Sequence, residues 1–518
     1  MSVKFNPGAP PSSKLAQAAD VARPSPVNDM PPVVGPDGKP LPDDPARWED
    51  GFSAGNTRPP PVVLSPPPAR PPVNTQPVSP PSTPPADKPT APPVNTAPPV
   101  EQVSGAGALR PMSPVAAVTG GLVHGKGAVQ QLNSNHPEII TREGLAKGNV
   151  AISTLANGLN HGFNGHFRLF SSNQNRTGSA LHQTVALHNP SDKPVTVRVD
   201  TWASTTTGEA GYKDTQKNPD GTAFKDRETF KQGISANGPG QFNAARILRG
   251  DNELPANKRT LVIPPGGTVT LPSSAVSDRQ ELITQGDLVS DGPVQAAIVY
   301  NTSPPSTEQV KKQLESGRYI ATSGHDKEPT PLDAPGQIIF SRVSGVVETS
   351  QYEGKLTNDT DQKRFLVTGA GEQSFAFNTK RGVDLGTGRN EASRVLVRAE
   401  HNKSAYESPL NYGAEFKLGG TFHNPTQQPK TVKLYIDSPL SSNDSRVMRG
   451  SFEVKVRTSP GAEPQKKLIT LSQSQQTRGK TPLAEFTLPP GASYEVDLRT
   501  IYGANNTGPQ TVRVVTSD

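Results

Sequence analysis

Four histidines in one stretch of the chain carry the side chains that could bind a transition metal. His161 and His166 stand five residues apart in HGFNGH, and His182 and His188 follow them. Imidazole nitrogens are common ligands of zinc, nickel and copper. A spacing of five does not place two side chains on one face of a helix, and the glycines between them favour a loop. We therefore predict no metal site and no cofactor, and a metal at these four histidines stays the open alternative.

Carboxylates are the second group of residues that could do chemistry. Glu407, Glu415 and Asp437 lie around one long motif, and Asp200 follows a related one. Two acids can cleave a glycosidic bond when they are held about 5 to 9.5 Å apart. Scattered acids are more often found on solvated strand faces, and the chain has no cysteine to act as a nucleophile. We predict that the protein is not an enzyme and has no catalytic residues.

Three loop motifs have residues that bind ions or phosphate in other proteins. DLGTGRN (384–390) holds only part of a phosphate-binding glycine pattern, and NPDGT (218–222) and SSNDSR (441–446) are rich in possible calcium ligands. Neither acidic motif has the spacing of a twelve-residue calcium loop. Turns stabilised by Asn and Asp side chains are the interpretation that these motifs favour.

The composition limits the remaining classes of function. The 518 residues carry a net charge of +6 and are 32% hydrophobic, and no run of four basic residues occurs. We therefore expect neither nucleic-acid binding, which needs clustered Lys and Arg, nor a membrane span, which needs about 18 consecutive apolar residues. The first residues also lack the apolar run of a signal peptide, so we expect no such leader.

Prolines are concentrated at the start of the chain, where residues 1–99 hold 29 of the 56. Ordering such a segment costs about 1–2 kcal/mol per residue in backbone entropy, and it has little apolar area to offset that cost. We predict a disordered, extended proline-rich tail over residues 1–124 that acts as a spacer.

Short apolar runs separated by Gly, Pro, Asn and Asp follow from about residue 125 and predict a mainly β fold. We expect one helix, capped by Ser306 with Gln309 and ended by Gly317, with Val310 and Leu314 on its buried face. Strands are expected at 184–199, 267–271, 294–300, 337–347, 431–436, 451–456 and 511–515.

Three motifs occur twice in the same order. TVALHNPSDKPVTVRVD (184–200) matches GGTFHNPTQQPKTVKLYI (419–436), so that His188 corresponds to His423. LVIPPGGTVTL (261–271) matches FTLPPGASYEVDL (486–498), and GPVQAAIVY (292–300) matches GPQTVRVVTSD (508–518). The Asn-Pro and Pro-Pro-Gly steps have the chemistry of tight turns between strands. A histidine repeated beside Asn-Pro suggests a hydrogen bond in a turn rather than a metal ligand.

The repeat predicts two related antiparallel immunoglobulin-like β-sandwich domains in tandem. We place the first at 125–300 and the second at 401–518. The segment 301–400 is expected to connect them, with a short helix and strands packed on the sandwiches.

A succession of short motifs resembles a bacterial, mainly cyanobacterial, family known as domain of unknown function 3370. The motifs are LNSNHPEIITREG (132–144), GHFRLF (165–170), NPSDKPVTV (189–197), ILRG (247–250), VIPPGG (262–267), GQIIFSRVSGV (336–346), RGVDLGTG (381–388) and NYGAEFKLGGTFHNPTQQPKTV (411–432). The resemblance covers roughly residues 125–518. It implies a two-part, β-rich protein that is exported or lies at the cell surface, and it brings no known activity and no catalytic residues.

Duplicated sandwich motifs without a catalytic motif predict a structural or surface-interaction protein of a cell-surface layer, coat or other extracellular assembly. Its partners would be other protein subunits or a particle surface, and export without a signal peptide or release from the cytoplasm would place it there. Two alternatives stay open: a component of a virus particle or injection device, and a protein that binds or acts on glycans. The low aromatic content, with only Trp48 and Trp202, argues against glycan platforms.

Overall fold

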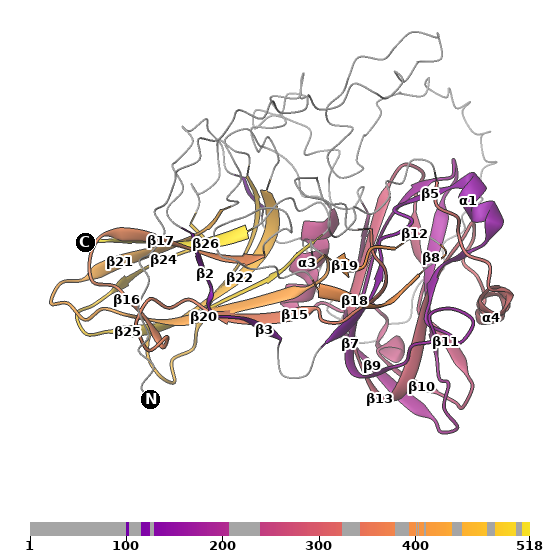
Figure 1. Ribbon diagram of the computed structural model, residues 1–518, viewed down its shortest axis with the longest axis horizontal. Helices are drawn as coiled ribbons and strands as arrows, with labels where there is room; N and C mark the ends of the chain where they lie inside the picture. Colours follow the sequence, from indigo (N-terminus) through magenta and orange to yellow (C-terminus); the bar gives the residue numbers. More distant parts are fainter. Residues whose placement is uncertain are drawn as a thin grey trace, which may run out of the picture. The chain divides into compact units, whose positions relative to one another are not determined.

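The computed structural model describes residues 100–102, 115–124, 129–206, 239–323, 342–378, 393–399, 401, 404–408, 411–437, 448–473, 482–503 and 510–518. In these residues the protein is mainly β, with strands in three sheets (Figure 1). Residues 1–99, Trp48 included, and the loop motifs at 218–222, 384–390 and 441–446 lie outside the described residues.

The largest sheet has thirteen strands. Its main path runs β10 (Thr260–Ile263), β9 (Val195–Thr206), β13 (Glu281–Asn301), β7 (Phe163–Arg176), β4 (Gln130–Ser134), β14 (Ser344–Val347), β18 (Ser393–Arg398) and β19 (Glu407–Ser408). Off this path, β8 (Leu181–His188) pairs with β13, β11 (Thr268–Thr270) and β12 (Ser274–Val276), β5 (Ile139–Thr141) pairs with β7, and β6 (Val150–Ser153) pairs with β13.

The long strand β13 belongs to two layers of this sheet. Its first part, up to Ser290, pairs with β7 and β9, and its second part, from Val294, pairs with β8 and β6. Asp291, Gly292 and Pro293 stand at the change, where the register with β7 shifts. Apolar side chains of both layers form one core, with Leu169 of β7 and Val185 of β8 among its members.

The other two sheets have eight and five strands. The eight-stranded sheet runs β1 (Val100–Gln102), β23 (Gln465–Gln473), β22 (Met448–Arg457), β25 (Ser493–Ile501), β20 (Glu415–His423), β15 (Gln351–Lys355) and β3 (Thr119–His124), with β16 (Arg364–Leu366) also paired to β20. The five-stranded sheet runs β2 (Val115–Ala117), β17 (Gly371–Asn378), β26 (Gln510–Ser517), β21 (Lys430–Asp437) and β24 (Ala484–Leu488).

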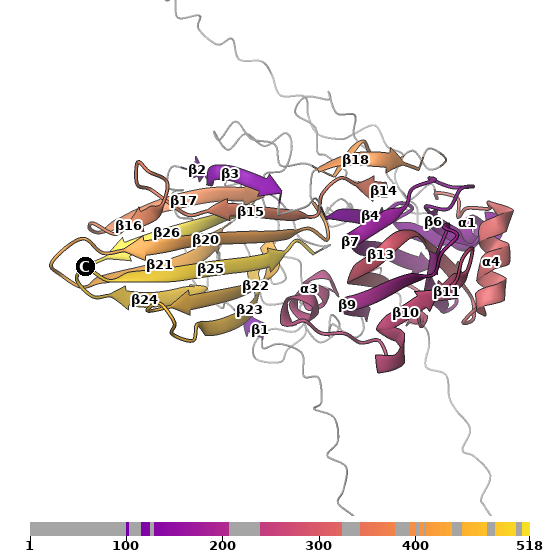
Figure 2. The same cartoon turned by 90° about the horizontal axis from the view of Figure 1, so that it is seen from below.

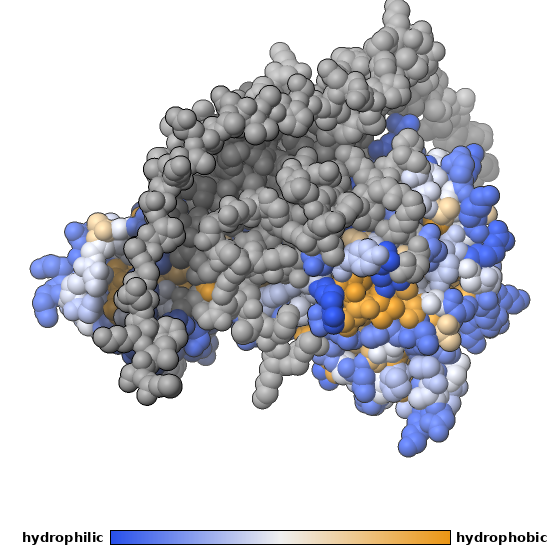
Figure 3. Space-filling view, viewed as in Figure 1, coloured by the Kyte–Doolittle hydropathy of each residue, from blue (hydrophilic) through white to orange (hydrophobic). Residues whose placement is uncertain are grey.

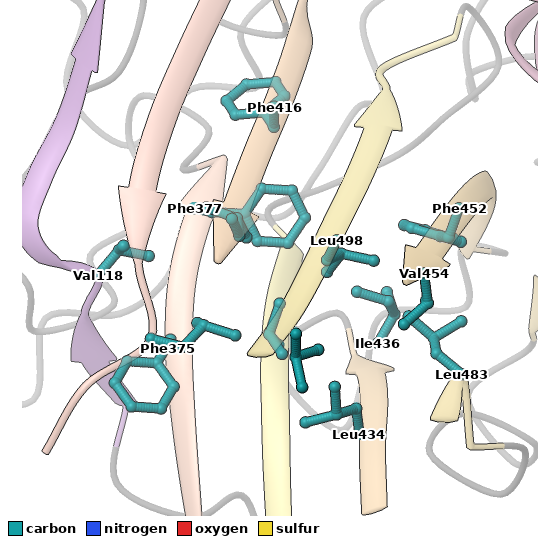
Figure 4. Close-up of a cluster of buried hydrophobic side chains, with 14 of the residues drawn as sticks. Val118, Phe375, Phe377, Phe416, Leu434, Ile436, Phe452, Val454, Leu483 and Leu498 are labelled. Atoms are coloured by element: carbon teal, nitrogen blue, oxygen red, sulfur yellow. The ribbon is translucent and has the colours of Figure 1, made fainter. Parts of the chain in front are cut away.

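These two sheets enclose a second core. Phe416 and Leu498 reach it from the eight-stranded sheet, and Phe375, Phe377 and Leu434 reach it from the five-stranded sheet (Figure 4). The strands alternate as a half-buried sheet requires. In β25, for example, Val496 and Leu498 are buried while the residues beside them point to the other face.

The prediction of antiparallel pairing throughout is wrong, because the sheets are mixed. β4 and β5 run parallel to β7, and β15 and β16 run parallel to β20. A parallel pair needs a crossover connection, and the chain between β5 and β7 supplies one with α1 (Arg142–Lys147) and β6. Paired strands also begin before residue 125, since β2 and β3 lie in the segment predicted to be tail and Val118 between them is buried in the second core.

The predicted helix is confirmed as α4 (Thr307–Ser316). Ser306 and Gln309 form a reciprocal capping box, and Gly317 ends the helix in the left-handed conformation. Val310 and Leu314 pack on the outer face of β13. This contact explains why the second part of β13 is apolar on both faces.

The prediction of a single helix is wrong, because the described residues contain two more. α1 is short and is capped by Thr141, whose hydroxyl accepts from the Gly144 amide. α3 (Pro239–Arg249) inserts Ala244, Ile247 and Leu248 against strands β9 and β25. The apolar spacing of QFNAARIL could have indicated α3.

Hydrophobic surface is concentrated at one place on the face shown in Figure 3, where β18 lies in Figure 1. Beneath the surface, Val343, Val347, Val395 and Ala405 of this part of the sheet form a small apolar cluster of their own.

Two loops far apart in the chain make the same set of hydrogen bonds. The Asn189 side-chain amide donates to the carbonyls of Lys193, Ile263 and Pro264, and that of Asn424 donates to those of Gln428, Leu488 and Pro489. In each loop the asparagine Oδ1 also accepts from the backbone amide and the hydroxyl two residues on, at Ser191 and Thr426.

The strands and turns beside these asparagines correspond as well. His188 Nδ1 bonds the Thr268 hydroxyl at 3.1 Å, and His423 Nδ1 bonds the Ser493 hydroxyl at 2.9 Å. Each Pro-Pro-Gly turn closes with a bond to the carbonyl of its first proline and has its glycine in the left-handed region, with φ of 61° at Gly266 and 72° at Gly491. Proline at the second turn position and glycine at the third are the residues that a type II turn requires.

The third pair of motifs does not correspond. The stretch 295–301 pairs with β8, whereas β26 pairs with β21, whose counterpart is β9. The strand that pairs with β9 is the first part of β13, residues 282–290. The shared Gly-Pro was misleading because in the first copy it marks the passage of β13 from one layer to the other.

Replacing Asn189 or Asn424 with alanine is expected to lower the free energy of unfolding by about 1–3 kcal/mol, because buried carbonyls lose their donor. Urea denaturation followed by circular dichroism measures the loss. Asn358→Ala is the matched control, since Asn358 bonds Leu366 in an exposed position where water can replace it. Equal losses in all three variants would contradict the role assigned to the two loops.

Candidate functional site

A buried arginine joins the largest sheet to the eight-stranded sheet. Arg168 of β7 is 2% exposed. Its Nε donates to Asp287 Oδ1 at 2.8 Å, its Nη1 donates to the carbonyls of Ser350 at 2.7 Å and Gly413 at 3.3 Å, and its Nη2 donates to Glu415 Oε2 at 3.4 Å. The planar guanidinium suits such a set because it presents its donors in a fixed fork. We call Arg168, Asp287 and Glu415 the clasp.

The clasp keeps its charges in spite of burial. Burial would lower the pKa of Arg168, but the charges and hydrogen bonds of Asp287 and Glu415 raise it above its ordinary value. Burial would likewise raise the pKa of Asp287, yet Arg168 and a hydrogen bond from His166 hold that pKa well below its usual range. Arg168 and Asp287 therefore stay ionised, and their opposite charges compensate each other within the clasp.

Gly413 allows the two sheets to approach at this point. Its φ is 82°, in the region that favours glycine, and a side chain there would meet Gln131 Oε1 at 2.7 Å and Phe170 Cβ at 2.9 Å. Its carbonyl accepts from both Arg168 and Gln285.

Ion pairs continue from the clasp to the outer face of the eight-stranded sheet. Glu415 Oε1 accepts from Arg499 Nη2 at 2.6 Å, and Arg499 Nη1 donates to Glu453 Oε1 at 3.2 Å. Lys455 and Lys466 then pair with Glu453. Burial favours a higher pKa for Glu453, but the hydrogen bond from Lys466 and the charge of Arg499 outweigh it and lower the pKa.

Strands β15, β20, β25 and β22 are neighbours in this sheet (Figure 2), and their register sets charged residues in two rows across its outer face. The first row follows the register β15, β20, β25, β22 and contains Glu353, Lys417, Arg499 and Glu453. The second row lies two residues further along each strand and contains Lys355, Gly419, Asp497 and Lys455. In the first row two cations stand side by side between two glutamates, and in the second row Gly419 leaves a gap between Lys355 and Asp497.

The gap at Gly419 lies in a hollow of about 760 Å³. Its charged lining comprises the cations Lys355, Lys363, Lys417, Lys455 and Arg499 and the acids Glu353, Asp361 and Asp497. A side-chain carbon on Gly419 would lie 3.1 Å from Asp497 Oδ1, so this carboxylate leans over the glycine.

The rim of the hollow is a loop that begins after β15 and is held by its own side chains. Asp359 Oδ1 accepts from the Lys363 amide at 2.8 Å, and Asn358 bonds both backbone groups of Leu366. Gln362 adopts a φ of 56° between them. The loop therefore places Asp361 and Lys363 beside the strands.

The arrangement is suited to binding a polar ligand. A glycosidase needs one carboxylic acid with a raised pKa. Glu415 and Glu453 lie on either side of Arg499, and the pKa of Glu453 is lowered even though burial alone would raise it. The face offers fixed cations and fixed carboxylates that can donate to and accept from a polar ligand.

The four histidines do not come together as a metal site. His161 bonds Gln130 and lies edge-on to Phe163, and His166 bonds Asp287. His182 lies near the start of β8, opposite Asn301 of β13, and His188 bonds Thr268 at the other end of that strand. Among the residues that the structure describes, no three His, Asp or Glu side chains are grouped as metal ligands.

The four acids named from the sequence are also separate. Asp200 is exposed and pairs with Arg198, Glu407 lies in the short strand β19, and Asp437 ends β21. Only Glu415 enters the site, and it does so as a partner of two arginines.

Sequence reasoning missed Arg168, Asp287, Glu453, Arg499 and Lys355. One signal was available for Arg168, since GHFRLF places a lone arginine among apolar residues in a stretch that reads as a buried strand. The other four stand in ordinary alternating strands, and only the register brings them together.

Three comparisons place the chain among known proteins. A family model described as "Protein of unknown function (DUF3370)" matches residues 119–516. No curated protein matches the chain.

None of the helices in the described residues has the length and apolar character needed to cross a bilayer.

Solved structures show only a weak likeness. The PBSX exported protein XepA is 10% identical, with 67% of this chain and 81% of that chain covered and a TM-score of 0.11. The tandem CBM22-1–CBM22-2 domains of Paenibacillus barcinonensis Xyn10C are also 10% identical, with 67% and 82% covered and a TM-score of 0.13. Both TM-scores are too low to support an argument about fold or function.

Replacing Arg168 with methionine is expected to lower the free energy of unfolding by about 3–5 kcal/mol at pH 7, since two buried carboxylates lose their cation. The pKa of Asp287 is depressed in the folded protein, so its ionisation stabilises the fold above the ordinary carboxyl value, and that contribution is lost as the pH falls through the folded pKa. Without Arg168, burial raises this pKa, and the deficit against the wild type should therefore shrink on acidification.

Urea denaturation at pH 7 and pH 4 measures both effects. The double variant Arg168→Met with Asp287→Asn should recover part of the loss at pH 7, because it removes one uncompensated charge. A deficit that is the same at both pH values would contradict the clasp.

Proposed function

Because the chain belongs to the DUF3370 family, whose function is unknown, we propose that it is a non-enzymatic structural or surface-interaction protein of a cell-surface, coat or extracellular assembly. Its partners are other protein subunits or a particle surface. The proposal includes the finer fold: two related, immunoglobulin-like β-sandwich units in tandem behind a proline-rich tail that acts as a tether.

The observation that supports this proposal is the way in which buried charged side chains are paired. Enzyme sites keep ionisable groups with shifted pKa values ready for the reaction. In the part of the chain that the structure describes, each buried Lys, Arg, Asp or Glu has a partner within the fold: Glu138 with Arg342, Arg168 with Asp287 and Glu415, Glu281 with Ser172, Lys430 with Asp518, Glu453 with Lys466, and Arg513 with Glu372.

The matching loops support the tandem arrangement. Asn189 and Asn424 make the same three carbonyl contacts, and the turns at Gly266 and Gly491 have the same conformation. The two loops thus repeat one local structure. The clasp joins the sheets, and each of its buried charges has a partner. Both features favour a rigid body whose surfaces contact other molecules.

Fractionation of the native cells tests the function. We expect the protein in the envelope or particle pellet, and we expect it to remain there after a low-salt wash, because an assembly protein is held by many contacts. Immunoblotting of each fraction, with a soluble cytoplasmic enzyme as the control, measures this. A monodisperse protein that stays in the soluble fraction with the control would rule the proposal out.

A further inference from the structure

We propose that the hollow on the eight-stranded sheet is a binding site for a carboxylate-bearing polysaccharide, such as a chain of uronic acid sugars. The inference deepens the proposed function, because it names the polymer through which the protein associates with a surface.

Two opposite charges in the hollow are not used by the fold. Lys355 and Asp497 form no ion pair with any residue that the structure describes, whereas Arg499 and Lys455 are paired with glutamates. Lys355 and Asp497 face each other across Gly419 in one row, two strand spacings or about 10 Å apart along the backbone. An ammonium donor thus stands opposite a carboxylate acceptor that leans over the glycine between them.

An acidic sugar fits both groups at once. Its carboxylate would accept hydrogen bonds from Lys355, and its hydroxyls would donate hydrogen bonds to Asp497. Both are charge-assisted hydrogen bonds, which are stronger than those between neutral groups. Carboxylates pair with Lys363, Lys417, Lys455 and Arg499, so Lys355 is the cation of the lining that is left for the carboxylate of such a ligand. A volume of about 760 Å³ is in the range of ligand sites.

The lining argues against other polymers. Single-stranded nucleic acid binds along uniformly positive grooves, and the lining of this hollow includes three acids. A protein partner normally meets an apolar centre, but the residues of the two rows that face the hollow are charged or are glycine. A neutral glycan would leave Lys355 without an anionic partner.

Binding of defined oligosaccharides to the purified full chain tests the proposal. Isothermal titration calorimetry is carried out with tetragalacturonate, a mannuronate tetramer and a hyaluronan tetrasaccharide as acidic probes. Maltotetraose is the neutral probe, and an eight-residue oligothymidylate is the phosphodiester probe. We expect an acidic probe to bind, with an affinity that falls as salt is raised, and the neutral and phosphodiester probes to bind at least tenfold more weakly.

Variants assign the binding to the hollow. Lys355→Gln should weaken it tenfold or more, and Gly419→Thr should do the same without changing any charge, because its side chain fills the floor and displaces Asp497. Threonine is favoured in strands, so this variant is expected to fold. Lys433→Gln is the matched control, since Lys433 pairs with Glu485 on the five-stranded sheet, and it should bind as the wild type does.

Several results would overturn the proposal: no binding of any acidic probe, tighter binding of the neutral or phosphodiester probe, or binding that both hollow variants retain. These outcomes are separate from the test of the proposed function. A protein that sediments with the envelope but binds no acidic glycan would leave the function standing and remove this inference, and a soluble protein that binds the glycan would do the reverse.

Discussion

The rest of the structure depends on the buried guanidinium of Arg168. It lies where β7, β13 and β20 meet, and it binds two carboxylates and two backbone carbonyls. A charge in such a place is costly unless its donors are satisfied, since the effective dielectric constant is low. The donors of the guanidinium are satisfied only when the sheets meet in the register that brings both carboxylates to it. The clasp therefore determines how the strands on either side are placed, while the two apolar cores supply most of the stabilisation.

Glycine has a different use at two points of this arrangement. At Gly413 the missing side chain lets one sheet come close enough for its carbonyl to reach Arg168. At Gly419 the missing side chain opens the outer face and leaves the hollow between Lys355 and Asp497. The missing side chain at Gly413 permits a contact within the protein, and the missing side chain at Gly419 leaves space for another molecule.

Local features could be predicted from the sequence, and distant ones could not. The cap at Ser306 and the turn at Gly266 are determined by residues within four positions, so their chemistry is visible in the sequence. The clasp joins Arg168 to Glu415, which is 247 positions away, and the sequence of neither strand indicates this pairing. The third repeat was misassigned because Gly-Pro signals a turn but does not tell which strand the chain pairs with afterwards.

Glu415 connects the stability of the protein with the shape of its charged face. One of its oxygens accepts from Arg168 inside the clasp, and the other accepts from Arg499 at the surface. Because the clasp fixes Glu415, it also fixes Arg499, and through Arg499 it orients Glu453 and the lysines beside it. Side chains that are held before a ligand arrives lose less entropy when it binds. The same buried charge that joins the sheets therefore prepares the cations around the hollow.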